Sequence, residues 1–125
     1  MNAAAAAGVT CLAVALASGC TTVPEKYSWG KYDTALYASY KDPTKVTELF
    51  NTLEAVVKGA GATHAPVAPG IYAEYGYLLL QQGKASEATP AFQQEKQHWP
   101  ESAVFMDRMI KVATQNPAAM PAKSQ

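Results

Sequence analysis

All of the charge in this 125-residue chain lies after residue 24. Ten Lys and Arg residues balance ten Asp and Glu residues, and the first of them is Glu25. The chain therefore joins an uncharged apolar leader to a body of roughly 100 residues, which is enough for one small domain. The zero net charge argues against nucleic acid as a partner, because phosphate binding requires an excess of cationic side chains.

The leader has the features of an export signal. Residues 3–17 are apolar, a run shorter than the roughly 20 residues that a membrane-spanning helix needs. Small residues then precede a cysteine in Ala17-Ser18-Gly19-Cys20, which is typical of the site where a bacterial lipoprotein is acylated and cleaved. We expect residues 1–19 to be the signal peptide and Cys20 to be lipidated. The alternative is ordinary cleavage after Ala17, which would leave Cys20 as a free thiol.

The cysteines favour lipidation. Cys11 lies inside the leader and is removed with it, so only Cys20 remains in the mature chain. A lone exposed thiol is a liability in an oxidising periplasm, and acylation removes it. Thr21 follows Cys20, at a position where aspartate commonly signals retention in the inner membrane. We therefore expect a protein anchored to the periplasmic face of the outer membrane, with no cofactor apart from the covalent lipid.

The body shows the period of an α-helix. One apolar stripe consists of Val46, Leu49, Phe50, Leu53, Val56 and Val57. This spacing predicts a helix over 43–58, which begins at Asp42-Pro43 and ends at Gly59. The preceding segment 29–41 has similar spacing and is predicted to be its antiparallel partner.

Three further helices are predicted over 69–82, 86–97 and 101–114, after a Gly- and Pro-rich loop at 59–70. The last helix is expected to turn four apolar side chains inward, namely Val104, Phe105, Met109 and Val112. No segment alternates with the period of a strand. We expect an all-α fold of about five helices in antiparallel hairpins over 29–114, between a tether at 20–28 and a disordered tail at 115–125.

Residues 69–102 match the tetratricopeptide pattern, a 34-residue helical hairpin. Its signature positions hold Tyr72, Tyr75, Gly76, Leu79, Ala88, Phe92 and Pro100. Gly76 and Ala88 are small where the two helices are expected to cross closely. Glu95 stands where the pattern prefers a small residue, which predicts looser packing there. The helix over 101–114 would cap the hairpins, because stacked repeats need a terminal element to close their core.

A longer resemblance covers residues 27–112. Tyr27-Ser28-Trp29-Gly30-Lys31-Tyr32, Pro69-Gly70-Ile71-Tyr72-Ala73 and Pro100-Glu101-Ser102-Ala103-Val104-Phe105-Met106 carry it. The chain resembles a domain of unknown function in small bacterial lipoproteins, which are often encoded beside lipoproteins similar to the curli secretion channel. The resemblance implies a periplasmic accessory of an outer-membrane assembly, without assigned catalytic residues.

The sequence offers little catalytic chemistry. His64 and His98 are its histidines, and Glu95 with His98 forms an E-x-x-H pair of the kind found in di-iron bundles. Such sites need a second copy of the pair and two further glutamates, and the chain has no second E-x-x-H. A solvated pair on a helix face is therefore expected in place of a metal site. We expect no enzymatic activity.

The aromatic residues allow two interpretations. Tyr27, Trp29, Tyr32, Tyr37 and Tyr40 crowd the first helix, either as core or as a docking surface or membrane-interface belt. A second group lies on one face in the tetratricopeptide register, where it would either bind a protein partner or be partly buried under the first hairpin. It comprises Ala73, Tyr77, Leu80 and Gln81.

Together these features predict a lipid-anchored periplasmic adaptor that binds protein partners through its helical-hairpin surface. By resemblance, the partner would be a curli-pore-like outer-membrane lipoprotein complex. The alternative function is a periplasmic activator of a peptidoglycan synthase, which would share the same anchor and fold.

Overall fold

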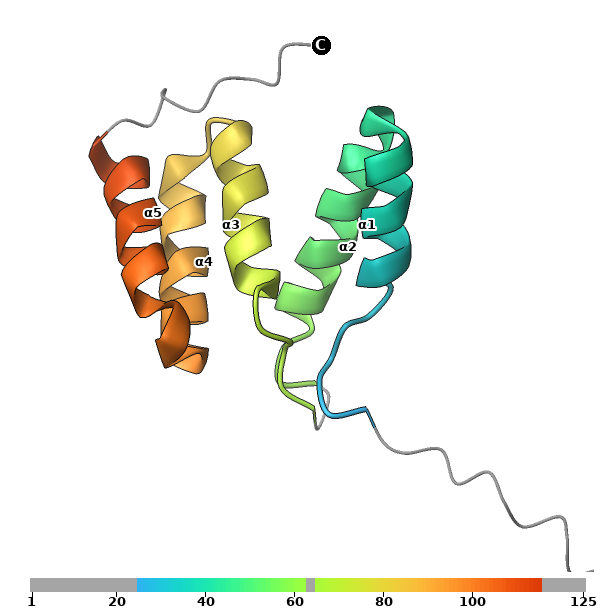
Figure 1. The fold of residues 1–125 in the computed structure, drawn as a ribbon, viewed down its shortest axis with the longest axis horizontal. Helices are drawn as coiled ribbons and strands as arrows, with labels where there is room; N and C mark the ends of the chain where they lie inside the picture. Colours follow the sequence, from blue (N-terminus) through green and yellow to red (C-terminus); the bar gives the residue numbers. More distant parts are fainter. Residues whose placement is uncertain (1–24, 63–64, 116–125) are drawn as a thin grey trace, which may run out of the picture.

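The computed structural model describes residues 25–62 and 65–115, which form five α-helices (Figure 1). These are α1 (Tyr32–Lys41), α2 (Val46–Lys58), α3 (Ile71–Gln81), α4 (Ala85–His98) and α5 (Ala103–Gln115), with 3-10 turns at Pro43–Lys45 and Pro100–Ser102. The described residues contain no strand, only one isolated bridge between Ser28 and Val67. The predicted all-α fold is confirmed. None of the helices described is both long enough and apolar enough to cross a membrane.

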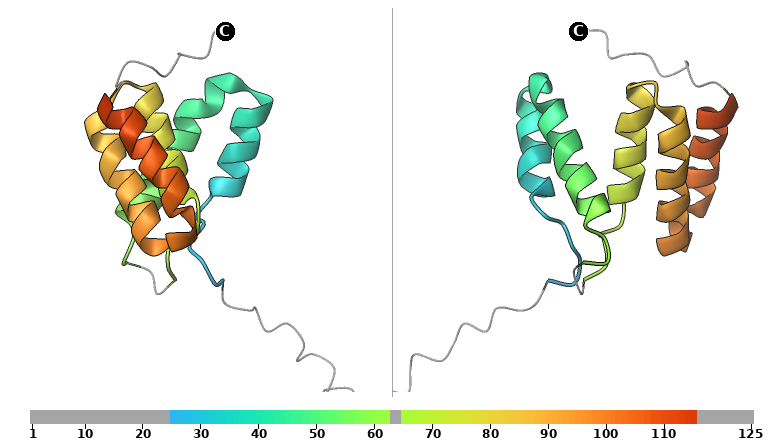
Figure 2. Two further views of the ribbon diagram at one scale, coloured as in Figure 1. Left: turned by 60° about the vertical axis from the view of Figure 1, so that its left-hand side comes forward. Right: turned by 180° about the vertical axis from the view of Figure 1, so that it is seen from behind.

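The helices follow one another in space in the order of the chain, each antiparallel to the next (Figures 1 and 2). α3, α4 and α5 pack side by side along their lengths. α2 and α3 approach each other near the loop that joins them, and their axes diverge away from it. α1 and α5 therefore lie at the two ends of the row.

Two apolar clusters hold the row together. The first joins α1, α2, α3 and the loop before α3, and its buried members are Ala35, Leu49, Leu53, Val67, Ala68, Ile71, Tyr72 and Leu78. The second joins α3, α4 and α5 through Leu79, Leu80, Ala88, Phe92, Met106 and Ala113. Phe50 and Tyr75 pack against both clusters, so these two rings connect the halves of the domain.

Local sequence explains where the helices begin and end. The Asp42 carboxylate accepts hydrogen bonds from the backbone N–H of Thr44 at 3.0 Å and from its hydroxyl at 2.7 Å, which starts the turn into α2. Gly83, with φ of +76°, reverses the chain between α3 and α4. There the backbone N–H of Lys84 donates to the carbonyl of Leu79 at 2.9 Å, which closes the end of α3.

The hairpin of α3 and α4 is tightest at Gly76. A Cβ atom on this glycine would lie 2.7 Å from Cε1 of Phe92, and the Phe92 ring is fully buried. Ala88 is buried as well. The two small residues thus lie where the helices approach closely, as the tetratricopeptide pattern predicts.

The folded body includes part of the predicted tether. The backbone N–H of Ser28 donates to the carbonyl of Pro66 at 2.7 Å, and the N–H of Ala68 donates to Ser28 at 3.3 Å. The Tyr27 ring meets Trp99 edge-on, with centroids 5.5 Å apart. Contacts with the domain therefore begin at Tyr27. The predicted signal peptide and Cys20 lie outside the described residues.

The prediction for the last helix was wrong at two positions. Val104 and Phe105 are exposed, whereas Met106 and Ala113 are the buried residues of α5. α5 ends the described row and packs on α4 alone among its longer neighbours, so one narrow stripe of it is covered. α5 also includes Gln115, the first residue of the predicted tail, and residues 116–125 lie outside the described part.

The close approach at Gly76 gives a stability prediction. Gly76→Ala should lower the free energy of unfolding by about 1–2 kcal/mol, because crowding against the immobile Phe92 ring outweighs the better helix propensity of alanine. Urea unfolding followed by circular dichroism measures the change. Gln93→Ala, on an exposed position of α4, is the control and should change stability little. A Gly76→Ala protein as stable as the parent would contradict the close crossing.

Candidate functional site

The predicted partner-binding residues of α3 do not share one environment. Tyr77 is 38% exposed, and Ala73 and Gln81 are half-buried. Leu80 is only 2% exposed and belongs to the cluster that contains Met106 of α5. The prediction that Leu80 lies on the docking face was therefore wrong, since its side chain is buried in the cluster shared by α3, α4 and α5.

A groove between α2 and α3 contains one of these residues. This interhairpin groove has a volume of about 540 Å³ and opens where the two helices diverge. Its lining on α2 consists of Val46, Thr47, Phe50 and Asn51. The other side is formed by Leu78 and Gln81 of α3 and by Gln82, which follows that helix. Tyr77 is not among the lining residues, but it lies one helical turn before Gln81 and therefore on the same side of α3.

Phe50, one of the residues that line the interhairpin groove, stacks on Tyr75 of α3. The rings of Phe50 and Tyr75 stack with centroids 5.4 Å apart and an angle of 30°. The ammonium of Lys84 lies 5.7 Å from the Phe50 ring centre. The Tyr75 hydroxyl donates to Glu54 at 3.4 Å. Burial, helped by the nearby Glu54 charge, raises the pKa of Tyr75 above its ordinary value, so this hydroxyl stays neutral.

The lining of the groove indicates what it can bind. Leu78 is buried and Phe50 half-buried, so they offer an apolar floor. Thr47, Asn51 and the two glutamines supply groups that both donate and accept hydrogen bonds. None of the lining residues carries a charge. An apolar floor with a neutral amide rim suits the main chain and alternate side chains of an extended peptide.

Sequence reasoning missed the α2 side of this groove. Val46 and Phe50 belong to the apolar stripe of the predicted helix, but only Leu49 and Leu53 of α2 are buried. The available signal was the polar pair Thr47 and Asn51, which lie four residues apart beside the stripe.

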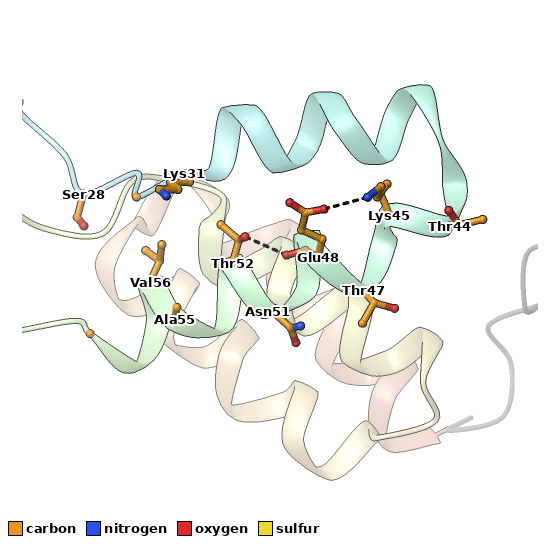
Figure 3. Close-up of a pocket in the computed structure, with 12 residues that line it drawn as sticks. Ser28, Lys31, Thr44, Lys45, Thr47, Glu48, Asn51, Thr52, Ala55 and Val56 are labelled. Atoms are coloured by element: carbon orange, nitrogen blue, oxygen red, sulfur yellow. Dashed lines mark hydrogen bonds and ion pairs between the residues drawn. The ribbon is translucent and has the colours of Figure 1, made fainter.

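A larger hollow of about 760 Å³ lies on the outward face of α2 and extends to the segment before α1 (Figure 3). Its polar groups bond along their own helix. Lys45 and Glu48 form an ion pair at 3.7 Å, and the Thr52 hydroxyl donates to the Glu48 carbonyl at 2.9 Å. Because these groups do not converge on a common point, we do not assign a binding site here.

A third hollow, of about 790 Å³, follows the outer face of α1. Four exposed side chains that line it, which we call the aromatic face, are Trp29, Leu36, Tyr37 and Tyr40. Tyr37 is 64% exposed and Tyr40 is 82% exposed. Core packing is therefore the wrong interpretation for both.

Tyr32 and Tyr27 do pack against the first cluster. The Tyr32 hydroxyl donates a hydrogen bond to the carboxylate of Glu74, which joins α1 to α3. Burial is the main cause that raises the pKa of Tyr32 above its ordinary value, and Glu74 adds to it.

The E-x-x-H pair is divided between two environments. Glu95 is only 2% exposed, whereas His98 is exposed and stacks on the Tyr72 ring with centroids 5.5 Å apart. The expectation of a solvated pair was wrong for Glu95. Within 25–62 and 65–115, no three or more His, Cys, Asp and Glu side chains gather as a potential metal site. His64 lies outside those ranges.

Glu95 instead caps the start of α3. Gly70, with φ of +90°, precedes that helix and has no side chain to cap it. The Glu95 Oε1 atom accepts a hydrogen bond from the Gly70 N–H at 2.7 Å. A carboxylate at a helix N-terminus also interacts favourably with the helix dipole. This long-range cap is a role that the tetratricopeptide pattern did not predict for Glu95.

The protonation of Glu95 is set by opposing effects. Burial raises the pKa of its carboxyl, and this outweighs the N–H groups of Gly70, Ala73 and Tyr72, which lower it. Since the pKa is higher in the folded state, the folded state binds a proton more tightly than the unfolded state does. The contribution of Glu95 to stability therefore falls as the pH rises from about 4.5 through the folded pKa.

Two substitutions test this cap. Glu95→Ala removes the acceptor and should lower the free energy of unfolding by about 1–2 kcal/mol. Glu95→Gln keeps an oxygen acceptor without the charge, and it should lose less stability and show a flatter pH dependence above about pH 4.5. Urea unfolding over a pH series measures both. Equal losses for the two variants would contradict the capping role.

The comparisons with known proteins identify one family. A search of curated proteins and a search of solved structures each find no match. A family model described as a domain of unknown function, DUF4810, matches residues 26–109. The match includes α1 to α4 and the first half of α5. Because it spans more than half of the chain, the protein belongs to the DUF4810 family.

Proposed function

We propose that this protein is a non-enzymatic, lipid-anchored adaptor in the periplasm, an accessory subunit of an outer-membrane lipoprotein or secretion assembly. It binds an extended segment of a protein partner in the interhairpin groove. The partner proposed from the sequence resemblance is a curli-pore-like outer-membrane lipoprotein complex.

The observation that carries this proposal is the neutral lining of the interhairpin groove. Its apolar floor at Leu78 and Phe50 is bordered by amide and hydroxyl groups, and no Asp, Glu, His or Cys lines it. Main-chain amides of an extended peptide match such a rim, since each peptide group both donates and accepts.

The proposed location rests on the leader. An uncharged apolar run ending at Cys20 predicts an acylated N-terminus. Two or three acyl chains bind stably to a bilayer, because each buried CH₂ contributes about 0.8 kcal/mol. The domain would then stay close to the membrane in which a pore-like lipoprotein is held.

Substitutions at the groove test partner binding. Tyr77→Asp, one helical turn from the groove residue Gln81, and Val46→Asp in the groove lining should each reduce recovery of the partner from crosslinked envelopes by about tenfold, because a buried, unpaired charge opposes docking. Phe105→Asp is the matched control, since it introduces the same charge at an exposed apolar side chain that lies on α5, away from the groove. It should leave recovery unchanged.

The identity of the recovered protein separates the two candidate functions. A pore-like lipoprotein supports the adaptor role, and a peptidoglycan synthase supports the alternative. If Tyr77→Asp and Val46→Asp remain folded by circular dichroism and retain full recovery, the groove is not the docking surface.

The anchor has its own test. Cys20→Ser should release the protein from the membrane fraction, because the acylated atom is lost. Cys11→Ser should remain attached, since Cys11 lies in the leader that is removed. Fractionation and mass spectrometry of the mature N-terminus give the result. An unmodified Cys20 in the parent protein would show that the anchor is wrong.

A further inference from the structure

We infer that the aromatic face of α1 rests on the phospholipid surface, so that the domain is attached to the membrane at two points. This inference rests on the lipid anchor proposed above. It assigns the aromatic face to lipid and leaves the interhairpin groove to the protein partner.

The side chains of the aromatic face have the chemistry of the membrane interface. Trp29, Tyr37 and Tyr40 each combine an apolar ring with a polar group, and such residues gather where one end meets acyl chains and the other meets water. Leu36 adds a purely apolar side chain to the same hollow. Leu36, Tyr37 and Tyr40 are exposed on α1, as in interfacial helices, and Trp29 precedes that helix and lines the same hollow.

One lysine lies beside these rings. The Lys41 ammonium is 5.7 Å from the centre of the Tyr37 ring. Long lysine side chains can extend beyond such rings to reach phosphate groups. Glu25 and Asp33 line the same hollow, so both signs of charge are present. Zwitterionic headgroups match this mixture, and we expect contact that does not require an anionic membrane.

The length of the intervening chain places this surface at the bilayer. Cys20 precedes Glu25, the first described residue, by five positions, which span at most about 18 Å when fully extended. Trp29 follows four residues later, and α1 begins at Tyr32. The aromatic face thus begins at Trp29, nine positions after the proposed anchor at Cys20.

Tethering also makes a small contact sufficient. A group held on a short flexible linker experiences an effective concentration in the millimolar range, so a contact too weak to bind vesicles alone is occupied once the chain is anchored. The few exposed rings near α1 would therefore need to bind lipid only weakly. The exposed Val104 and Phe105 lie on α5 at the other end of the row and have no such tether beside them.

Trp29 can report on its own surroundings. The chain has two tryptophans, and the other is Trp99. The buried indole N–H of Trp99 has no hydrogen-bond partner in the described structure, so Trp99→Phe sacrifices no hydrogen bond. In this background, all tryptophan emission comes from Trp29.

The test uses the full chain carrying Trp99→Phe, recovered from cell membranes and reconstituted into phosphatidylcholine vesicles with brominated acyl chains. We expect the emission of Trp29 to shift to shorter wavelength and lose intensity relative to vesicles with unbrominated chains. Adding Tyr37→Ser and Tyr40→Ser should weaken the quenching severalfold. Adding Phe105→Ser instead should leave it unchanged, because that side chain lies on α5. Replacing part of the lipid by phosphatidylglycerol should change it little.

The outcomes separate the surface from the anchor. Mass spectrometry of the same sample shows whether Cys20 is acylated, and the Trp29 emission is measured on whichever form is recovered. Quenching supports the inference in either case. Emission that is equal in brominated and unbrominated vesicles overturns it, even with an acylated Cys20. Loss of partner recovery on Tyr37→Ser and Tyr40→Ser, without quenching of Trp29, would show that α1 docks a protein instead.

Discussion

The stack of Phe50 on Tyr75 is the contact on which the rest of the domain depends. These two rings pack against both apolar clusters, and their centroids are 5.4 Å apart. A body this small buries a limited core, so two large rings shared by both clusters let α1 and α2 stabilise the same unit as α3 to α5. Because the contact lies at one level of α2 and α3, the helices can diverge beyond it. The interhairpin groove is the consequence of that divergence.

A second constraint is the start of α3. Pro69 and Gly70 allow the chain to turn sharply into the helix, but neither can cap it with a side chain. The Glu95 carboxylate from the far end of α4 supplies the acceptor instead. The cap forms only when α3 and α4 are packed in register, so it couples local helix ending to tertiary structure. Together with the Gly76 contact to Phe92, it fixes the hairpin at both its middle and its open end.

The sequence predicted those features that depend on neighbours along the chain. Apolar spacing located the helices, and Gly83 and Pro100 separated them, because backbone conformation at glycine and proline is a local property. Prediction from the sequence failed where the burial or the partner of a side chain depends on a helix that is distant along the chain. Glu95 was assigned to solvent because its partner is 25 positions away. Leu80 was placed on a docking face because its neighbours along the chain do not show that it belongs to a buried cluster with residues of α4 and α5. Tyr37 and Phe105 were candidates for the core because an apolar side chain does not reveal whether another helix follows.

Exposed apolar side chains at both ends of the row have a common physical origin. A stacked helix array buries the faces between neighbours, whereas the first and last helices each keep one face uncovered. The two ends nevertheless differ in chemistry. α5 exposes Val104 and Phe105, which have no polar group, whereas α1 and the segment before it expose Trp29, Tyr37 and Tyr40, with Lys41 beside the Tyr37 ring. Only the α1 end follows the proposed anchor. An end face that would otherwise be a liability can therefore orient the domain, with α1 toward the lipid and the interhairpin groove turned to a partner.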